Sequence, residues 1–269
     1  MTHPLCSTEV DDFTMAYVDT GGDKPVLLLV HGFPLDHSMW KQQLGGLVDD
    51  CRIIVPDLRG FGVSTRGAKP LSMRTHADDL AALLDTLAVS TPVTFCGLSM
   101  GGYIGWQFLA HHYARVRNII LCDTRAANDD EVTARARQRM ANKVLTDGSQ
   151  LAADGMIPKL FADATYTEQP DVVESTREVI LNTQPSVISE TQIELSQRID
   201  ARSLLTDFDL PALLICGEQD QISRASEMKD IATSLPKGEF QEVPGAGHMA
   251  PLEDPDTVNE MIREFVQSS

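Results

Sequence analysis

The segment 93–106, VTFCGLSMGGYIGW, places Ser99 among glycines at positions 97, 101 and 102. An apolar run precedes the serine and a helix-like run follows it, which is typical of a sharp strand-to-helix turn. Such a turn forces the serine into a strained backbone conformation, and larger side chains beside it would collide with the adjoining strand and helix. The helix dipole favours negative charge at this position. We therefore predict that Ser99 is a nucleophile, the alternative being a glycine-rich turn without chemistry.

A serine hydroxyl needs a base to activate it, and the base needs an acid to orient it. After a turn of this kind, the acid and then the histidine follow the serine along the chain. Asp220 ends the apolar run PALLICGEQD, and His248 lies in the later loop GAGHMAP. We predict Asp220 as the acid and His248 as the base. Asp123, after the run NIILC, and Glu218 are rival acids, and Asp123 is expected to be a hinge residue instead.

The other six histidines are expected to have different roles. His31 follows the run LLLV and should anchor the next loop by hydrogen bonds, because one base already suffices. His37 lies upstream of Ser99 in the chain. The remaining four lie near the N-terminus or at the ends of predicted helices: His3, His76, His111 and His112.

Acyl transfer also requires donors that stabilise an oxyanion. One donor is predicted to be the backbone N–H of Met100, the residue after the nucleophile. The other is predicted to be the backbone N–H of Phe33, in the loop HGFP.

In the glycine-rich loop VPDLRGFGVS, we expect Asp57 and Arg59 to form an ion pair that stabilises the loop. We expect Ser64 to take no part in chemistry.

Five continuous apolar runs predict strands that are buried on both faces of a parallel sheet: PVLLLVHG, CRIIVPD, PVTFCGLS, NIILCDT and PALLICGEQD. Helical patterns lie between these runs, which predicts an α/β, doubly wound sheet with its site at the carboxyl ends of the strands. The segment FTMAYVDTGG alternates and predicts a strand that belongs to an antiparallel edge of the sheet. Residues 125–207 show only helical patterns. We predict a helical cap, or lid, over 125–207, inserted into a core made of 1–124 and 208–269.

The composition of the chain indicates which partners, metal sites and cellular location to expect. The 269 residues carry 22 basic and 39 acidic side chains, a net charge of −17, which argues against nucleic acid and anionic membranes as partners. Five cysteines at irregular spacing predict free thiols rather than disulfides or a metal site. The N-terminus lacks a signal peptide pattern and no apolar run could span a membrane, so a cytoplasmic protein is expected, a monomer or a homodimer.

Taken together, five segments resemble the α/β-hydrolase superfamily: HGFPLDHSMW, DLRGFGVS, GLSMGG, GEQD and GAGHMAPLEDP. The resemblance implies a mostly parallel eight-stranded sheet, a triad of Ser99, Asp220 and His248, and oxyanion donors at Phe33 and Met100. Within the superfamily the chain is similar to small carboxylesterases and to hydrolases of 3-oxoadipate enol-lactone. Dehalogenases and epoxide hydrolases are excluded, since they carry an aspartate where this chain has Ser99.

These observations predict a cofactor-free serine hydrolase that cleaves small carboxylic esters through an acyl-enzyme on Ser99. The strongly negative surface slightly favours neutral esters. A lactonase or a C–C bond hydrolase with the same triad is an alternative within the superfamily. An alternative of another class is a triad-bearing receptor or regulator with negligible turnover.

Overall fold

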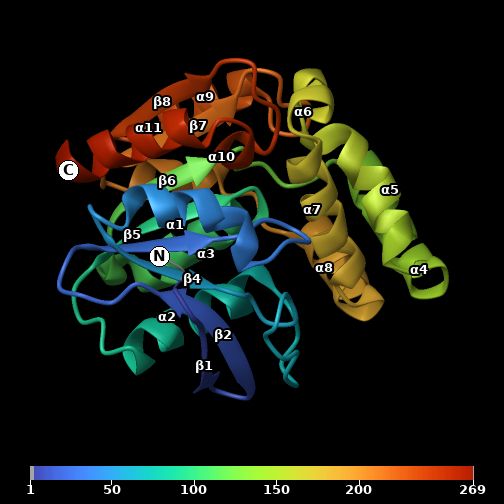
Figure 1. Cartoon of the computed structure of the whole chain (residues 1–269), viewed down its shortest axis with the longest axis horizontal. Coiled ribbons are helices and arrows are strands. Elements are labelled where there is room, and N and C mark those ends of the chain that lie inside the picture. Colours follow the sequence, from blue (N-terminus) through green and yellow to red (C-terminus); the bar gives the residue numbers. More distant parts are fainter. Residues whose placement is uncertain (1–2, 269) are drawn as a thin grey trace.

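The five apolar runs form the buried centre of one sheet in the computed structural model, which describes residues 3–268 (Figure 1). They are β3 (Val26–Val30), β4 (Arg52–Pro56), β5 (Val93–Leu98), β6 (Val116–Cys122) and β7 (Ala212–Gly217). Every residue of β3, β5 and β7 is buried, as expected for strands covered on both faces. These five strands pair in parallel, and β8 (Gly238–Val243) extends the parallel part beside β7.

Two antiparallel strands complete the eight-stranded sheet, whose order is β1-β2-β4-β3-β5-β6-β7-β8. The segment predicted to lie in an antiparallel edge is β2 (Phe13–Asp19), and its antiparallel pairing is confirmed. The outermost strand, β1 (Leu5–Val10), pairs antiparallel on its outer side, so the two strands together form that edge. Most residues of β1 are exposed, so β1 lacks the apolar pattern by which the other strands can be recognised in the sequence.

Helices flank the sheet along its length. Helix α1 packs against α11, α2 packs against α3, and α9 packs on β7 and β8. The bounds of the helices outside the segment 125–207 are η1 (His37–Trp40), α1 (Lys41–Leu47), α2 (Met73–Thr86), α3 (Met100–His112), η2 (Tyr113–Arg115), α9 (Ala225–Ser234), α10 (Ala250–Glu253) and α11 (Pro255–Ser268). Among residues 3–268, no helix is both long and apolar enough to cross a membrane.

The chain between β6 and β7 is helical, and we refer to residues 125–207 as the helical segment. Its elements are α4 (Glu131–Asp147), α5 (Ser149–Leu160), α6 (Asp163–Glu168), α7 (Pro170–Asn182), α8 (Pro185–Gln197) and η3 (Arg202–Asp207). Helix α4 packs along α8 and α5 packs along α7, and the group stands to one side of the sheet (Figure 1). The four longer helices were predicted from their periodicity, whereas the six-residue α6 is too short to show one.

Candidate active site

Ser99 occupies the sharp turn between β5 and α3. Its backbone has φ 52° and ψ −109°, so the predicted strained conformation is confirmed. Two hydrogen bonds hold the turn from the neighbouring strand. The Ser99 N–H donates to the Cys122 carbonyl at 2.9 Å, and Thr124 Oγ1 donates to the Ser99 carbonyl at 2.6 Å. The strain is therefore fixed by contacts to the end of β6.

The glycines around Ser99 are required by close packing of main chain against main chain. A Cβ at Gly97 would lie 2.5 Å from the carbonyl carbon of Gly101. A Cβ at Gly101 would lie 2.3 Å from the carbonyl oxygen of Val30. These distances are below any that real Cβ atoms adopt, and backbone cannot move aside as a flexible side chain can. The predicted collision with the adjoining strand and helix is thus confirmed.

His248 and Asp220 are joined by a buried hydrogen bond. His248 Nδ1 lies 2.8 Å from Asp220 Oδ2, and the two side chains are 3% and 0% exposed. The other oxygen of Asp220 accepts from the N–H groups of Ile222 and Ser223 at 2.7 and 3.0 Å. Because Nδ1 donates to the carboxylate, the neutral imidazole keeps its lone pair on Nε2. His248 can therefore accept a proton at Nε2, and the Asp220 carboxylate can stabilise the resulting imidazolium.

Ser99 and His248 line the same cavity, which has a volume of about 170 Å³. Phe33, from the loop after β3, and Met100, the first residue of α3, line it as well. The first N–H groups of a helix have no partner within the helix, so the Met100 N–H is available to an anion. The structure thus brings together four of the five predicted site residues at one cavity, with Asp220 behind His248.

Of the two rival acids, only Asp123 lies near this group. It is fully buried with a positive φ of 47°, and polar atoms of Asp123, Asp220 and His248 lie within 4.8 Å of one another. Asp123 Oδ1 accepts from the Gly217 N–H at 2.8 Å, whereas Oδ2 has no hydrogen-bond partner among the described residues. Burial, together with the charge of Asp220, raises the pKa of Asp123 well above its usual range. Glu218 instead accepts from the Gly245 N–H at the surface.

His31 anchors the loop that carries Phe33, as predicted. Its Nδ1 donates to the Gly32 carbonyl at 2.9 Å, and its Nε2 accepts from the Leu58 N–H at 3.0 Å. Both ring nitrogens of His31 therefore form hydrogen bonds to main-chain groups. Burial lowers the pKa of His31 and keeps the ring neutral in this role.

The predicted ion pair between Asp57 and Arg59 does not form. Arg59 is fully buried and pairs with Asp79 and Asp12 instead, at 2.8 and 2.5 Å. Asp57 accepts from His37 Nδ1 at 2.7 Å and from two backbone N–H groups. The reason is the left-handed turn at Gly62, which passes so close to the Asp57 carboxylate that a Cβ there would lie 2.3 Å away. The loop's backbone therefore lies against the Asp57 carboxylate, and both oxygens of this carboxylate accept from other donors.

Ser64 has a structural role, as predicted. Its hydroxyl donates to the Asp57 carbonyl at 2.7 Å and accepts from the Ala16 N–H at 2.8 Å. The cysteines of β5, β6 and β7 are buried and free, also as predicted: Cys96, Cys122 and Cys216.

Within residues 3–268, two groups of side chains have the composition of a metal site. They are Asp36, His37 and Asp57, and Asp123, Asp220 and His248. In each group, a histidine nitrogen lies 2.7–2.8 Å from a carboxylate oxygen. Two ligands of one zinc ion, each about 2.0–2.2 Å from the metal at a tetrahedral angle, would lie farther apart than this. The geometry in both groups is that of a hydrogen-bonded His–Asp pair.

Comparison with known proteins identifies the family of the chain. The family model for the alpha/beta hydrolase fold matches residues 25–255, which is most of the chain. The chain belongs to the α/β-hydrolase family. Its mostly parallel eight-stranded sheet is the fold that the resemblance implied.

Similar α/β-hydrolases include lactonases and esterases. The chain is 28% identical to 3-oxoadipate enol-lactonase 2 of Acinetobacter baylyi, over 95% of this chain and 94% of that one. An esterase from Thermogutta terrifontis, solved with malate bound, has a TM-score of 0.93 at 37% identity, with 98% of each chain covered. The enol-lactonase from Burkholderia xenovorans LB400 has a TM-score of 0.90 at 26% identity, covering 97% of this chain and 100% of that one.

The far wall of the cavity in this α/β-hydrolase consists of residues that sequence reasoning missed. Helices α4, α5 and α8 contribute Arg137, Gly155, Met156, Lys159, Leu160, Gln192 and Leu195. No motif marks such positions, since an amphipathic helix shows which of its faces is buried but not which residues meet a cavity. These cavity-lining residues can be identified only from the three-dimensional structure, which shows how the helical segment packs against the sheet.

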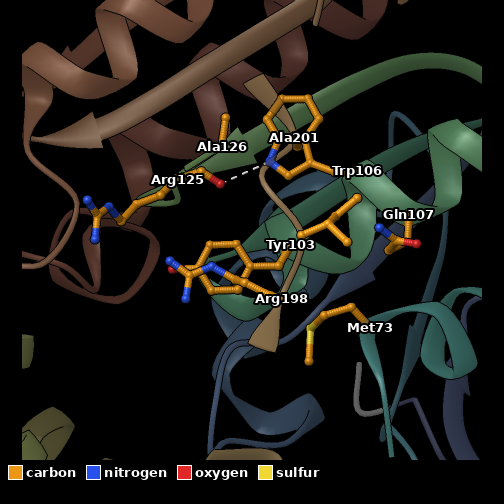
Figure 2. A pocket seen from close by; sticks show the side chains of 9 residues that line it. Met73, Tyr103, Trp106, Gln107, Arg125, Ala126, Arg198 and Ala201 are labelled. Atoms are coloured by element: carbon orange, nitrogen blue, oxygen red, sulfur yellow. Dashed lines mark hydrogen bonds between the residues drawn. The ribbon is translucent and has the colours of Figure 1, made fainter. Parts of the chain in front are cut away.

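A second, much smaller cavity shares Tyr103 with the first (Figure 2). The guanidinium of Arg198 lies over the Tyr103 ring, 4.4 Å from its centroid. Trp106 Nε1 donates to the Arg125 carbonyl at 3.0 Å, as drawn in Figure 2. These contacts tie both the start of the helical segment, at Arg125, and the residue after α8, Arg198, to α3 beside the cavity that holds Ser99.

Proposed function

We propose that this α/β-hydrolase cleaves small carboxylic esters, with Ser99 as nucleophile, His248 as general base and Asp220 as the orienting acid. One observation carries the proposal. The buried His248–Asp220 hydrogen bond stands at the same cavity as a serine in a strained strand-to-helix turn. A serine presented in this way, beside an imidazole oriented by a carboxylate, is an arrangement for acyl transfer.

In the first half-reaction, Ser99 Oγ attacks the ester carbonyl carbon while His248 Nε2 takes the hydroxyl proton. The carbonyl oxygen becomes an oxyanion, and the N–H groups of Phe33 and Met100 stabilise it. His248 then returns the proton to the departing alcohol, which leaves the acyl group on Ser99. Asp220 stabilises the imidazolium during these steps without itself taking the proton.

In the second half-reaction, water replaces the alcohol. His248 Nε2 takes a proton from the water as its oxygen attacks the acyl carbon, and the same two N–H groups stabilise the second oxyanion. The bond to Ser99 Oγ breaks as His248 returns the proton to it, and the acid is released. The net reaction consumes one ester and one water and yields one acid and one alcohol.

Lactone hydrolysis is the second candidate, because enol-lactonases are among the similar proteins over nearly the full chain. A lactone is a cyclic ester, so the steps are the same, except that the leaving alcohol stays attached to the acyl group. The acid and base assignments are therefore shared by both candidates.

The test is steady-state hydrolysis of p-nitrophenyl acetate and butyrate by the wild type and by Ser99→Ala. We expect turnover by the wild type and a loss of several orders of magnitude in Ser99→Ala. Ser234→Ala is the matched control, because Ser234 lies on α9 and its hydroxyl donates to the Asp230 carbonyl. Full activity in Ser99→Ala would refute the nucleophile. A single burst without turnover in the wild type would favour the receptor or regulator.

A further inference from the structure

Two cations stand in the wall of the cavity that holds Ser99. They are Arg137 of α4 and Lys159 of α5, and no aspartate or glutamate is among the residues that line this cavity. The chain as a whole carries a net charge of −17. Local charge, rather than net charge, sets the potential inside a cleft with low-dielectric walls. The charged side chains that line the cavity, Arg137 and Lys159, are therefore both cations on a molecule of negative net charge.

The charge of Arg137 is only partly neutralised inside the protein. Arg137 Nε donates to Asp129 Oδ2 at 2.6 Å, but Arg198 Nη1 also donates to the same carboxylate, at 2.6 Å. The Asp129 and Arg198 side chains are 1% and 3% exposed, so this pair is buried. One carboxylate thus faces two guanidinium groups, which leaves one positive charge in excess. Gln192 Oε1 accepts from Arg137 Nη1 at 3.3 Å and helps to fix the guanidinium at the wall.

Lys159 adds a second positive charge. It is exposed, and it forms no hydrogen bond or ion pair with any residue in the described part of the chain. Its flexible stem lets the ammonium group move to meet a charged group in the cavity. Arg137 offers a planar fork that matches a carboxylate, and Lys159 offers a mobile point charge.

The cavity is small and otherwise largely apolar. Its volume is about 170 Å³. Met156, Leu160 and Leu195 form apolar parts of the wall. A short hydrocarbon chain fits such a space, and an anionic group at its end would reach the two cations.

We propose that this cavity accepts esters of short acids whose acyl part carries a second, ionised carboxyl group, and that Arg137 and Lys159 bind this group. The inference rests on the proposed function and reverses the expectation of neutral substrates that net charge alone gives. The chemistry is unchanged: one ester bond breaks, water supplies the new acid oxygen, and the products are an alcohol and a dicarboxylate. A carboxylate on the acyl part, rather than on the alcohol, stays bound through both half-reactions.

The first test compares monoethyl glutarate with its neutral analogue, ethyl 4-carbamoylbutanoate. The two esters have nearly the same size and differ in the charge of the group at the end of the chain. We expect kcat/KM of the wild type to be roughly 10- to 100-fold higher for monoethyl glutarate, as for a charge-assisted hydrogen bond. Added NaCl should reduce this ratio, because salt screens exposed charges.

The variants Arg137→Gln and Lys159→Gln should each lower this anionic-to-neutral ratio by about tenfold. Arg137→Lys should restore part of it, which separates the role of charge from the role of shape. Arg135→Gln and Lys143→Gln are matched controls on α4, since both residues are exposed and neither lines the cavity. They should leave the ratio unchanged.

The second test is a binding measurement that does not depend on turnover. Ser99→Ala should bind glutaramate, which carries one carboxylate, more tightly than the neutral diamide glutaramide by calorimetry, and Lys159→Gln in the same background should reduce the difference. Equal binding of the two ligands, or an equal kcat/KM for the two esters, would overturn the carboxylate inference. If Ser99→Ala hydrolyses both esters as fast as the wild type, the proposed function fails instead, and the binding result still decides the inference.

Discussion

Two buried carboxyl groups lie beside His248, and their hydrogen bonds give them different roles. Asp220 accepts from His248 and from two backbone N–H groups, which suits an ionised carboxylate. Asp123 accepts from one backbone N–H, and its second oxygen has no partner within residues 3–268. Burial and the charge of Asp220 raise the pKa of Asp123, which favours its neutral form. In our proposal, the acid that orients His248 is therefore Asp220.

Asparagine substitutions distinguish the two acids. Asp220→Asn should lower kcat by roughly 10³- to 10⁴-fold, because the amide no longer holds the imidazole in the correct tautomer. Asp123→Asn should cost much less, because the amide oxygen can still accept from the Gly217 N–H and Asp123 makes no hydrogen bond to His248. The measurement is kcat for p-nitrophenyl butyrate with both variants. A larger loss in Asp123→Asn would make Asp123 the acid.

His76 is a buried histidine without a hydrogen-bond partner among the described residues. Burial lowers its pKa from 6.5 to about 3. Below pH 6.5 the unfolded chain binds a proton at this side chain and the folded protein does not. Stability that is fully present above pH 6.5 is therefore lost as the pH falls towards 3, by about 1.4 kcal/mol per pH unit.

His76→Leu should remove this part of the pH dependence. Urea unfolding of the wild type and of His76→Leu, at several pH values from 7 down to 5, isolates the contribution, since the carboxylates titrate alike in both. The wild type should lose about 2 kcal/mol more than the variant between pH 6.5 and 5. Parallel curves would show that His76 takes up a proton in the folded state as readily as in the unfolded state.

At the scale of elements, the strand-to-helix turn depends on contacts between main-chain segments that only glycine permits. Gly101 in α3 faces the Val30 carbonyl of β3, whereas a Cβ at Gly45 in α1 would meet nothing within 4 Å. The two positions are both helical and differ in the space beside them. They therefore form a matched pair for testing how tightly the turn is packed.

Gly101→Ala should destabilise the fold by about 1–3 kcal/mol, because the new methyl group overlaps a backbone oxygen. Gly45→Ala should be neutral or stabilise by up to about 1 kcal/mol, because alanine favours the helix and restricts the unfolded chain. The measurement is the free energy of unfolding in urea for both variants. A stable Gly101→Ala protein with full esterase activity would show that the turn tolerates a displacement of β3.

The helices and strands that can be predicted from the sequence are those whose burial produces a recognisable pattern of apolar residues. The fully apolar runs became the parallel strands, and the glycines next to Ser99 indicated the turn. The edge strand β1 and the short α6 leave no pattern, because one is mostly exposed and the other spans six residues. The partner of Arg59 and the cavity-lining positions Arg137 and Lys159 depend on which distant segments meet, and spacing along the chain does not determine that.

At the scale of the whole molecule, the net charge of −17 acts against the compact state. The positive wall of the cavity is a local exception within this surface. Repulsion among the excess carboxylates is screened by salt, and so are the exposed ion pairs that oppose it. With 39 acidic and 22 basic side chains, the repulsive contribution should dominate.

Raising NaCl from low to moderate concentration should therefore increase Tm. The measurement is thermal unfolding at pH 7 in a series of NaCl concentrations, with sucrose as a control for effects that are independent of charge. A Tm that falls as NaCl rises would mean that the surface ion pairs contribute more than the net repulsion costs.

The central claim is that Ser99 carries the acyl group, and acid quenching tests it most directly. The wild type and Ser99→Ala are mixed with p-nitrophenyl butyrate, quenched in acid and digested, and the peptide that contains position 99 is analysed by mass spectrometry. We expect a butyryl group on Ser99 in the wild type during turnover, and none in Ser99→Ala. Turnover without any acyl group on Ser99, or with the group on another residue, would contradict the account.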